Sequence, residues 1–205
     1  MHDLQLAVNL SGWRIFVQRR EDRAFLPVAE QVYQRDYYTC QYCAFQARQY
    51  QEIVNIDGNY TNNRLSNLIT ACCFCSQCLF IESAGVDDMG GGQLIHLSDI
   101  SQADLNSFCH VLFCAMGNGT GYQESAQAIY RGFKFLSQPI ETKFGNGTSN
   151  PAILGQLILE YESKDPTAKL DVLKDIRLLP SYTKFNVQLE AWAAAALEEL
   201  AEEAE

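Results

Sequence analysis

Two clusters of cysteines are the most reactive pattern in this chain. Cys40 and Cys43 form a C-x-x-C pair, and the run CCFCSQC at residues 72–78 holds four more cysteines. A C-x-x-C turn presents two thiolates from one tight bend, and two such turns complete the tetrahedron of a structural zinc site. We expect an intracellular chain, in which thiols stay reduced, so a disulfide framework is the weaker interpretation. The pattern therefore predicts bound Zn²⁺.

The second pair of ligands is ambiguous from spacing alone. Cys72 with Cys75 and Cys75 with Cys78 both satisfy C-x-x-C, whereas Cys73 fits neither arrangement. A redox-active dithiol is a weaker alternative, because little around CQYC would lower the pKa of a thiol. Spacing thus predicts a four-cysteine site but leaves its second pair open.

The overall charge limits the kinds of partner. The chain has 205 residues, 25 acidic against 15 basic side chains, and a formal net charge of −10. Nucleic-acid binding depends on Lys and Arg contacts with phosphate, so we expect no nucleic-acid partner. Neither a basic leader nor an apolar run long enough to span a bilayer is present. We therefore expect a cytoplasmic protein that is not inserted in the membrane.

The hydrophobic pattern predicts an α+β fold in three segments. In residues 1–35 the alternation in LQLAVNL and WRIFVQR predicts N-terminal strands, followed by a lead-in helix over FLPVAEQVYQRD. Residues 36–82 carry the cysteines and a strand at QYQEIVNI, which predicts a small ββα zinc module. In residues 83–205 a short strand is predicted at QLIHL, and the spacing is helical from Ser98 onward, with a final helix from about Tyr182. We expect the three segments to form one compact unit, with the zinc module joined to a C-terminal helical portion.

Capping signals mark the helices of residues 83–205. Ser101 and Asp104 stand at the N-cap and N3 positions of one helix, and Asn150 and Pro151 stand at the N-cap and in the first turn of another. His110 and Cys114 are four residues apart in the first of these helices and share a face. Because no third ligand lies near them in the sequence, they favour packing roles over a second metal site.

Aromatic side chains crowd the sequence around the first cysteine pair. Some must pack the small zinc module, but any that reach the surface would suit an extended peptide, since tyrosine is enriched at binding hot spots. The candidate partner-binding residues are Tyr37, Tyr38, Tyr42, Phe45 and Tyr50.

The segment from QRDYYTCQYC to NLITACCFC resembles the HNH endonuclease layout. In that layout an Arg-Asp pair and a C-x-x-C precede a strand ending in Asp-His, and an Asn-Leu pair stands five residues before the second C-x-x-C. Matching the Asn-Leu pair to Asn67 and Leu68 places the second C-x-x-C at Cys72. The resemblance thus implies one ligand set: Cys40, Cys43, Cys72 and Cys75.

The catalytic residues of the HNH layout are missing. The strand reads VNID, so Ile56 or Asp57 stands where the general-base histidine belongs, and Ser76-Gln77 replaces a further histidine. A nuclease of this kind needs both a base and side chains that hold a divalent ion. We therefore expect no catalytic residues and no enzymatic activity; the alternative is a metal-dependent HNH-type nuclease in which Asp57 and other carboxylates substitute.

Over nearly its whole length the chain resembles the IcmJ/DotN family of type IVB (Dot/Icm) secretion systems. The runs that carry this resemblance beyond the cysteines are GGGQLIHL, LNSFCHVLFCA, GTGYQESAQAIYRGFKF and PAILGQL. The resemblance implies a non-enzymatic subunit of the coupling complex that serves virulence through protein transport. It also implies that the chain binds the cytoplasmic C-terminal tail of the coupling ATPase (DotL), beside adaptor chaperones that recruit effectors. Through that ATPase it would be recruited to the inner membrane.

Overall fold

The fold is described by a computed structural model over residues 2–86, 89–119, 121–164 and 171–202. It is mixed α+β, as predicted, with two separate antiparallel sheets of two strands each. The strands are β1 Gln51–Asn55, β2 Leu68–Cys72, β3 Gly92–His96 and β4 Ile176–Pro180. The helices are α1 Leu10–Arg20, α2 Leu26–Arg35, α3 Cys73–Ser76, α4 Gln102–Gly117, α5 Gln123–Phe135, α6 Gln138–Phe144, α7 Pro151–Lys164 and α8 Asn186–Glu202.

The two N-terminal strands predicted over residues 4–19 are wrong. Residues Leu10–Arg20 form α1, and the residues before it make no regular strand. Asn9 caps α1, because its side chain accepts a hydrogen bond from the backbone N–H of Gly12 at 2.9 Å. The buried residues Trp13, Phe16 and Arg19 recur every three positions, as one face of a helix requires. Residues with this helical spacing form the buried face of α1, and the alternation in WRIFVQR does not produce a strand.

The strand, strand, helix order of the predicted zinc module is confirmed in β1, β2 and α3. The two strands pair antiparallel, with Gln51 opposite Cys72 and Asn55 opposite Leu68. Every residue of β2 is buried, which matches its apolar sequence LITAC. The chain passes directly from Cys72 at the end of β2 into α3, so the strand end and the first helical turn present the second cysteine cluster together.

The C-terminal portion contains a sheet that the sequence pattern did not fully predict. A strand over QLIHL was expected and is β3, but its partner β4 was not. The predicted helix starts are confirmed at Ser101, whose side chain accepts from the Asp104 N–H, and at Asn150, whose side chain accepts from the Ala152 N–H. The final helix begins at Asn186 rather than Tyr182, and its predicted course beyond Glu202 lies outside the described residues.

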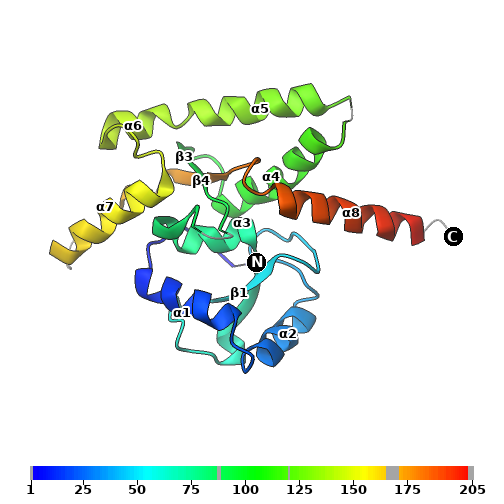
Figure 1. The fold of residues 1–205 in the computed structure, drawn as a ribbon. Coiled ribbons are helices and arrows are strands. Elements are labelled where there is room, and N and C mark those ends of the chain that lie inside the picture. The colour runs from blue at the N-terminus through cyan, green and yellow to red at the C-terminus, as the bar shows by residue number, and fades with distance from the viewer. Residues whose placement is uncertain (1, 87–88, 120, 165–170, 203–205) are drawn as a thin grey trace.

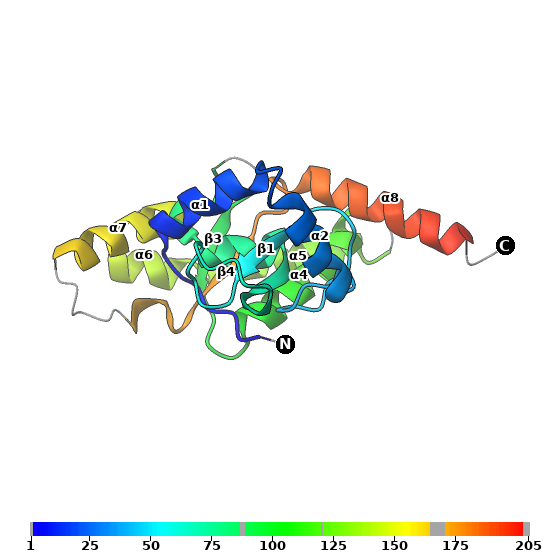
Figure 2. The same ribbon diagram turned by 90° about the horizontal axis from the view of Figure 1, so that it is seen from below.

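One hydrophobic cluster connects the cysteine turns to both sheets and to the helices around them. It includes buried residues from the N-terminal segment, the turns, α4 and β4, and ends at Phe185 before α8. In Figure 1, α1 and α2 lie on one side of this core and α5 and α6 on the other. Figure 2 turns the molecule and shows α7 and α8 extending in opposite directions. None of the helices in the described part of the chain is long and apolar enough to cross a membrane.

The contact between α7 and the segment after the cysteine run requires a glycine. A Cβ atom built on Gly155 would lie 2.6 Å from both the Cα and the N atoms of Glu82, a backbone that cannot move aside cheaply. Gly155→Ala should therefore destabilise the fold by about 1–3 kcal/mol in urea unfolding. Gly132→Ala in α5 is the control, because its Cβ would meet no heavy atom within 4 Å. The control should be neutral or stabilising by up to about 1 kcal/mol, and equal losses in both variants would contradict the close approach.

Candidate metal centre

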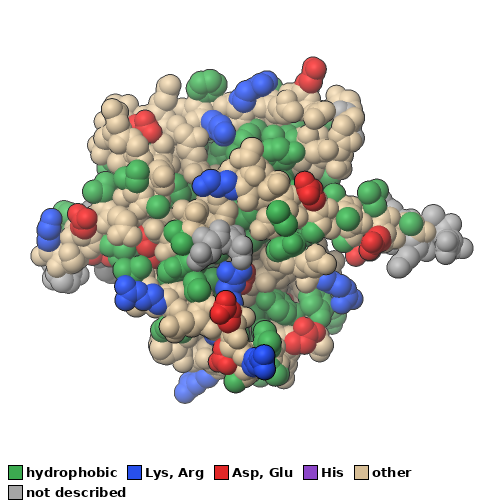
Figure 3. All heavy atoms as spheres, in the orientation of Figure 1, with side chains coloured by type: hydrophobic (Ala, Val, Ile, Leu, Met, Phe, Trp, Pro, Cys, Tyr) green, Lys and Arg blue, Asp and Glu red, His purple; other side chains and the backbone are tan. Residues whose placement is uncertain are grey.

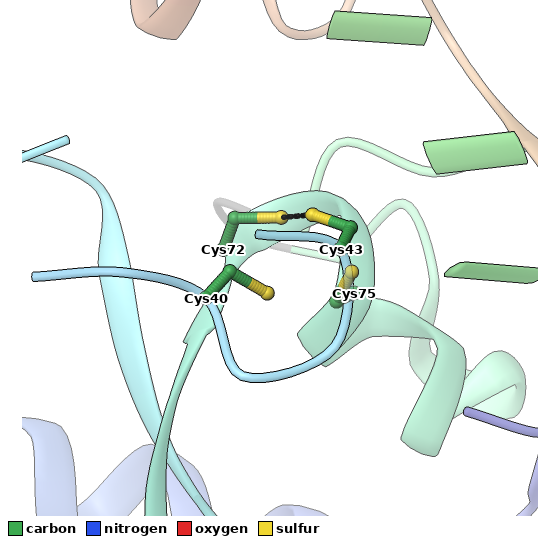
Figure 4. Close-up of side chains that lie close together, drawn as sticks. All are labelled: Cys40, Cys43, Cys72 and Cys75. Carbon is green, nitrogen blue, oxygen red and sulfur yellow. Dashed lines mark hydrogen bonds between the residues drawn. The ribbon is translucent and has the colours of Figure 1, made fainter. Parts of the chain in front are cut away.

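Two chain segments distant in sequence bring their cysteines to one point. Cys40 and Cys43 lie on the turn after α2, where the Ala44 N–H donates to the Cys40 carbonyl at 3.0 Å and closes a tight bend. Cys72 ends β2, and Cys75 lies in α3. Figure 4 shows the four side chains pointing toward one another from these two segments.

The geometry of the four sulfurs fits a single metal ion. The Sγ atoms of Cys40, Cys43, Cys72 and Cys75 all lie within 4.8 Å of one another, and all four residues are buried. Tetrahedral zinc with Zn–S bonds of about 2.3 Å requires sulfurs about 3.8 Å apart. The Cys43 and Cys72 sulfurs are 3.6 Å apart, which matches that spacing and is too far for a disulfide bond. The cluster therefore has the geometry of a closed metal site.

Electrostatics also favour a cation among the sulfurs. Burial raises the pKa values of the Cys72 and Cys75 thiols well above the usual value of a cysteine. Hydrogen bonds from Cys43, Cys72 and Cys75 instead lower the pKa of Cys40. Four buried thiolates could not coexist without a compensating positive charge. Soft thiolate donors select Zn²⁺ and similar ions over Mg²⁺ or Ca²⁺. These residues could hold such an ion.

The structure decides between the two candidate C-x-x-C pairs that spacing left open, Cys72 with Cys75 and Cys75 with Cys78. Cys72 and Cys75 belong to the four-sulfur cluster, whereas Cys78 lies outside it and its Sγ instead donates to the Phe74 carbonyl at 3.2 Å. Burial raises the pKa of both Cys73 and Cys78, which suits neutral packed thiols. Cys114 is exposed and contacts the Asn118 amide, so it joins no cluster with His110.

Two polar side chains of α4 reach the sulfurs, and the sequence pattern did not identify this role. The Asn106 amide Nδ2 lies 3.2 Å from Cys75 Sγ, and His110 Nε2 lies 3.4 Å from Cys72 Sγ. Both residues are buried. Their spacing of four residues on one helix face was the available signal, but nothing local to α4 indicates that this face meets the cysteines.

His110 is clamped in a stack of rings. Its imidazole lies parallel to Phe45 at 3.7 Å and to Phe74 at 4.2 Å between ring centroids, and Trp192 of α8 meets it edge-on at 5.2 Å. Burial lowers the pKa of His110 to about 3, so the ring stays neutral at ordinary pH. Both flanking phenylalanines belong to the cysteine-bearing segments, so the stack joins those segments to α4 and α8.

Asp57, one of the two residues at the position of the missing histidine, holds a loop together. One carboxylate oxygen accepts from the backbone N–H of Asn59 and from the Asn67 amide at 2.9 Å each, and the other accepts from the Asn62 amide at 2.7 Å. The Asn62 and Asn67 hydrogen bonds lower the pKa of Asp57. A carboxylate with a lowered pKa and occupied oxygens is poorly suited to take a proton from water.

The five aromatic residues proposed for partner binding separate into exposed and packed groups. Tyr37 is 77% exposed and Tyr50 39%, and Tyr38 is half-buried. Tyr42 is only 5% exposed and offers little surface, because its ring faces the core beside the cysteines. Phe45 stacks on His110. Of the five candidates, Tyr37 and Tyr50 are thus exposed, Tyr38 and Phe45 are half-buried, and Tyr42 is buried.

Comparison with known proteins places the chain in a family. No family model matches the sequence. The Type 4 apparatus protein DotN of Legionella pneumophila is 56% identical over 200 residues, which cover 98% of this chain and 94% of that protein. The chain therefore belongs to the DotN family of type IV secretion apparatus proteins.

Proposed function

We propose that the chain is a zinc-stabilised, non-enzymatic scaffold subunit of a type IV secretion coupling complex. In this proposal it binds the cytoplasmic C-terminal tail of the coupling ATPase (DotL) and supports effector recruitment next to the adaptor chaperones. It would reach the inner membrane through that ATPase. The observation that carries the proposal is the 56% identity to a type IV apparatus protein over 98% of the chain.

The cysteine centre supports a structural role for the metal. A catalytic zinc keeps one coordination position open for water or substrate, whereas four protein thiolates close the site. All four cysteines are buried, so a substrate would have no direct access to the ion. Zinc is the ion that such a set of four thiolates most commonly holds in structural sites. In this proposal its contribution is to fold the turns that carry the neighbouring surface.

The sheet edges argue against docking of the tail as an added strand. Some outward backbone groups of each strand already have hydrogen-bond partners. Tyr33 and Arg19 bond the carbonyls of Gln51 and Ile53 in β1, and Gln102 bonds both the N–H and the carbonyl of Leu178 in β4. In β2 the carbonyl of Leu68 accepts from Arg35, and in β3 the N–H of Leu94 donates to the Ser149 carbonyl. In this proposal the tail is therefore recognised mainly through side chains.

A cavity beside the first cysteine turn is suited to such recognition. It has a volume of about 350 Å³ and is lined by Gln34, Tyr37, Tyr38, Gln46, Ala47, Arg48 and Glu199. We call it the tyrosine cavity. It combines aromatic rings, side-chain amides and the guanidinium of Arg48, which lies 4.9 Å from the centre of the Tyr38 ring. Figure 3 shows that hydrophobic side chains also emerge between charged ones on the face it draws, including along α8.

Binding of the tail should depend on Tyr37. In isothermal titration calorimetry between this chain and a purified tail of the coupling ATPase, Tyr37→Ala should weaken the affinity by about tenfold or more, because exposed tyrosines are frequent hot spots. Tyr161→Ala on α7 is the matched control, since Tyr161 is also exposed but lies far along another helix. Absence of binding by the unmodified chain would overturn the proposed function. Unchanged affinity in Tyr37→Ala alone would instead place the interface elsewhere.

A further inference from the structure

Helix α4 brings two side-chain nitrogens that can donate an N–H to the cysteine centre from outside the two cysteine turns. Asn106 Nδ2 lies 3.2 Å from Cys75 Sγ, and His110 Nε2 lies 3.4 Å from Cys72 Sγ. Residues four apart on a helix share one face, so a single rigid element carries both donors. The two nitrogens meet different sulfurs of the second C-x-x-C pair, and Asn106 Nδ2 also lies 3.2 Å from the Phe74 carbonyl and 3.8 Å from Cys78 Sγ.

The orientation of the Asn106 amide is determined by its neighbours. Its Oδ1 accepts from Gln102 Nε2 at 2.9 Å, which turns Nδ2 toward the sulfur. Gln102 is in turn held by β4, where it accepts from the Leu178 N–H at 2.8 Å and donates to the Leu178 carbonyl at 2.9 Å. A continuous chain of hydrogen bonds thus runs from β4 through α4 to Cys75.

The orientation of His110 is determined by stacking. Phe45 follows Cys43 by two residues and Phe74 lies between Cys72 and Cys75, and their rings enclose the imidazole nearly parallel, at 4° and 13°. Within the described residues the other ring nitrogen, Nδ1, is buried and has no hydrogen-bond partner. Among the described residues, the contact with Cys72 is therefore the one hydrogen-bonding contact of this buried ring, and a thiolate there would accept the Nε2 proton.

We propose that Asn106 and His110 are positioning residues of the metal centre, which hold the Cys75 and Cys72 thiolates through N–H···S hydrogen bonds. A zinc ion with four thiolates carries a formal charge of roughly −2, which is costly in a buried site unless nearby dipoles offset it. Two N–H donors aimed at the sulfurs reduce that cost and fix the ligand geometry. Metal retention then depends on the docking of α4, β4 and α8 against the cysteine turns. This inference rests on the metal-binding part of the proposed function.

The test separates the effect of losing an N–H donor from the effect of disturbing the ring packing, in the zinc-loaded, full-length chain. Asn106→Leu removes one N–H donor, and His110→Phe removes the other while keeping an aromatic ring in the stack. Cys109→Ala is the matched control, because Cys109 is a buried residue of the same helix beside His110 but is not one of the four clustered cysteines. Zinc transfer to a chromogenic chelator measures retention, and the charge-transfer band of the Co²⁺-substituted protein reports directly on the thiolates.

We expect both donor variants to lose zinc to the chelator about 10- to 100-fold more readily than the unmodified chain, as is typical when an outer partner of a metal ligand is removed. Both should also shift the thiolate-to-cobalt band, whereas Cys109→Ala should leave the band in place even if it lowers the melting temperature. If the unmodified chain binds one zinc ion, and both donor variants keep the zinc and the cobalt band unchanged, this inference alone is overturned. An unmodified chain that binds no zinc would overturn the proposed metal centre together with it.

Discussion

Cys40→Ser and Cys72→Ser will each lower the bound zinc below one ion per chain, whereas Cys78→Ser will retain the ion. The expectation follows from the geometry, since Cys40 and Cys72 belong to the four-sulfur cluster and Cys78 does not. A serine hydroxyl is a harder and more weakly acidic group than a thiol, so it does not replace a thiolate at a soft, closed site. Loss of one ligand should therefore release the ion.

The effect on stability should be large because metal binding and local folding are one equilibrium. Structural zinc contributes about 10–16 kcal/mol of apparent binding free energy in zinc-finger peptides, which is comparable with the whole stability of a typical domain, about 5–15 kcal/mol. Here the cysteine turns also carry Phe45 and Phe74, whose rings stack on His110. Unfolding of the turns would expose these rings, so we expect both ligand variants to lose solubility.

Elemental analysis of tag-free protein gives the metal content, and thermal unfolding gives the change in stability. Cys78→Ser is a demanding control, because Cys78 is as fully buried as Cys72 and its sulfur also makes a hydrogen bond. It should lower the melting temperature modestly without loss of zinc. The reverse pattern, with zinc kept in Cys72→Ser and lost in Cys78→Ser, would show that the metal uses the other C-x-x-C pair.

Arg19→Met should destabilise the fold by about 3–5 kcal/mol, independently of the metal. Arg19 is a buried cation whose guanidinium donates to the Asn55 side chain at 2.7 Å, to the Asn63 side chain at 3.1 Å and to the Ile53 carbonyl at 2.6 Å. Hydrogen bonds to a charged group contribute about 1.5–3 kcal/mol each, and their loss leaves buried acceptors unsatisfied. Burial lowers the pKa of Arg19, which reflects the cost that these bonds offset.

Urea unfolding of the zinc-loaded protein measures this change. Arg14→Met is the matched control, since Arg14 is exposed on the same helix and the substitution is the same. The control should stay within about 0.5 kcal/mol of the unmodified chain. A loss below about 1 kcal/mol in Arg19→Met would show that α1 is not held to the β1–β2 unit through this guanidinium.

Several features of this protein were readable from short stretches of sequence. The C-x-x-C pairs predicted cysteine turns, and these turns are the ones that meet in the structure. The helix starts at Ser101 and Asn150 were predicted because an N-cap bonds to a backbone N–H two or three residues away. Such signals depend on neighbours in the chain, so they survive without knowledge of the fold.

Other features required partners from distant parts of the chain. The helix α1 forms where alternation predicted strands, and its Asn9 cap is held in place by the Gly58 carbonyl and by Glu82. The strand β4 exists because it pairs with β3, which lies 80 to 88 residues earlier, in a register running from Ile176 opposite His96 to Pro180 opposite Gly92. Local propensity is weak at both places, and tertiary contacts determine the outcome.

The surroundings of the metal centre show most clearly which features local sequence predicts and which depend on contacts between distant residues. Spacing identified cysteines able to bind an ion but left the second pair open. The clustering of aromatic residues made Tyr42 a candidate for partner binding, although the fold buries its side chain. The roles of Asn106 and His110 could not be derived from α4 alone, because a helix face acquires its function from whatever packs against it. Sequence periodicity reports which side of an element is apolar, whereas the position of that side relative to distant sulfurs depends on how the whole core packs.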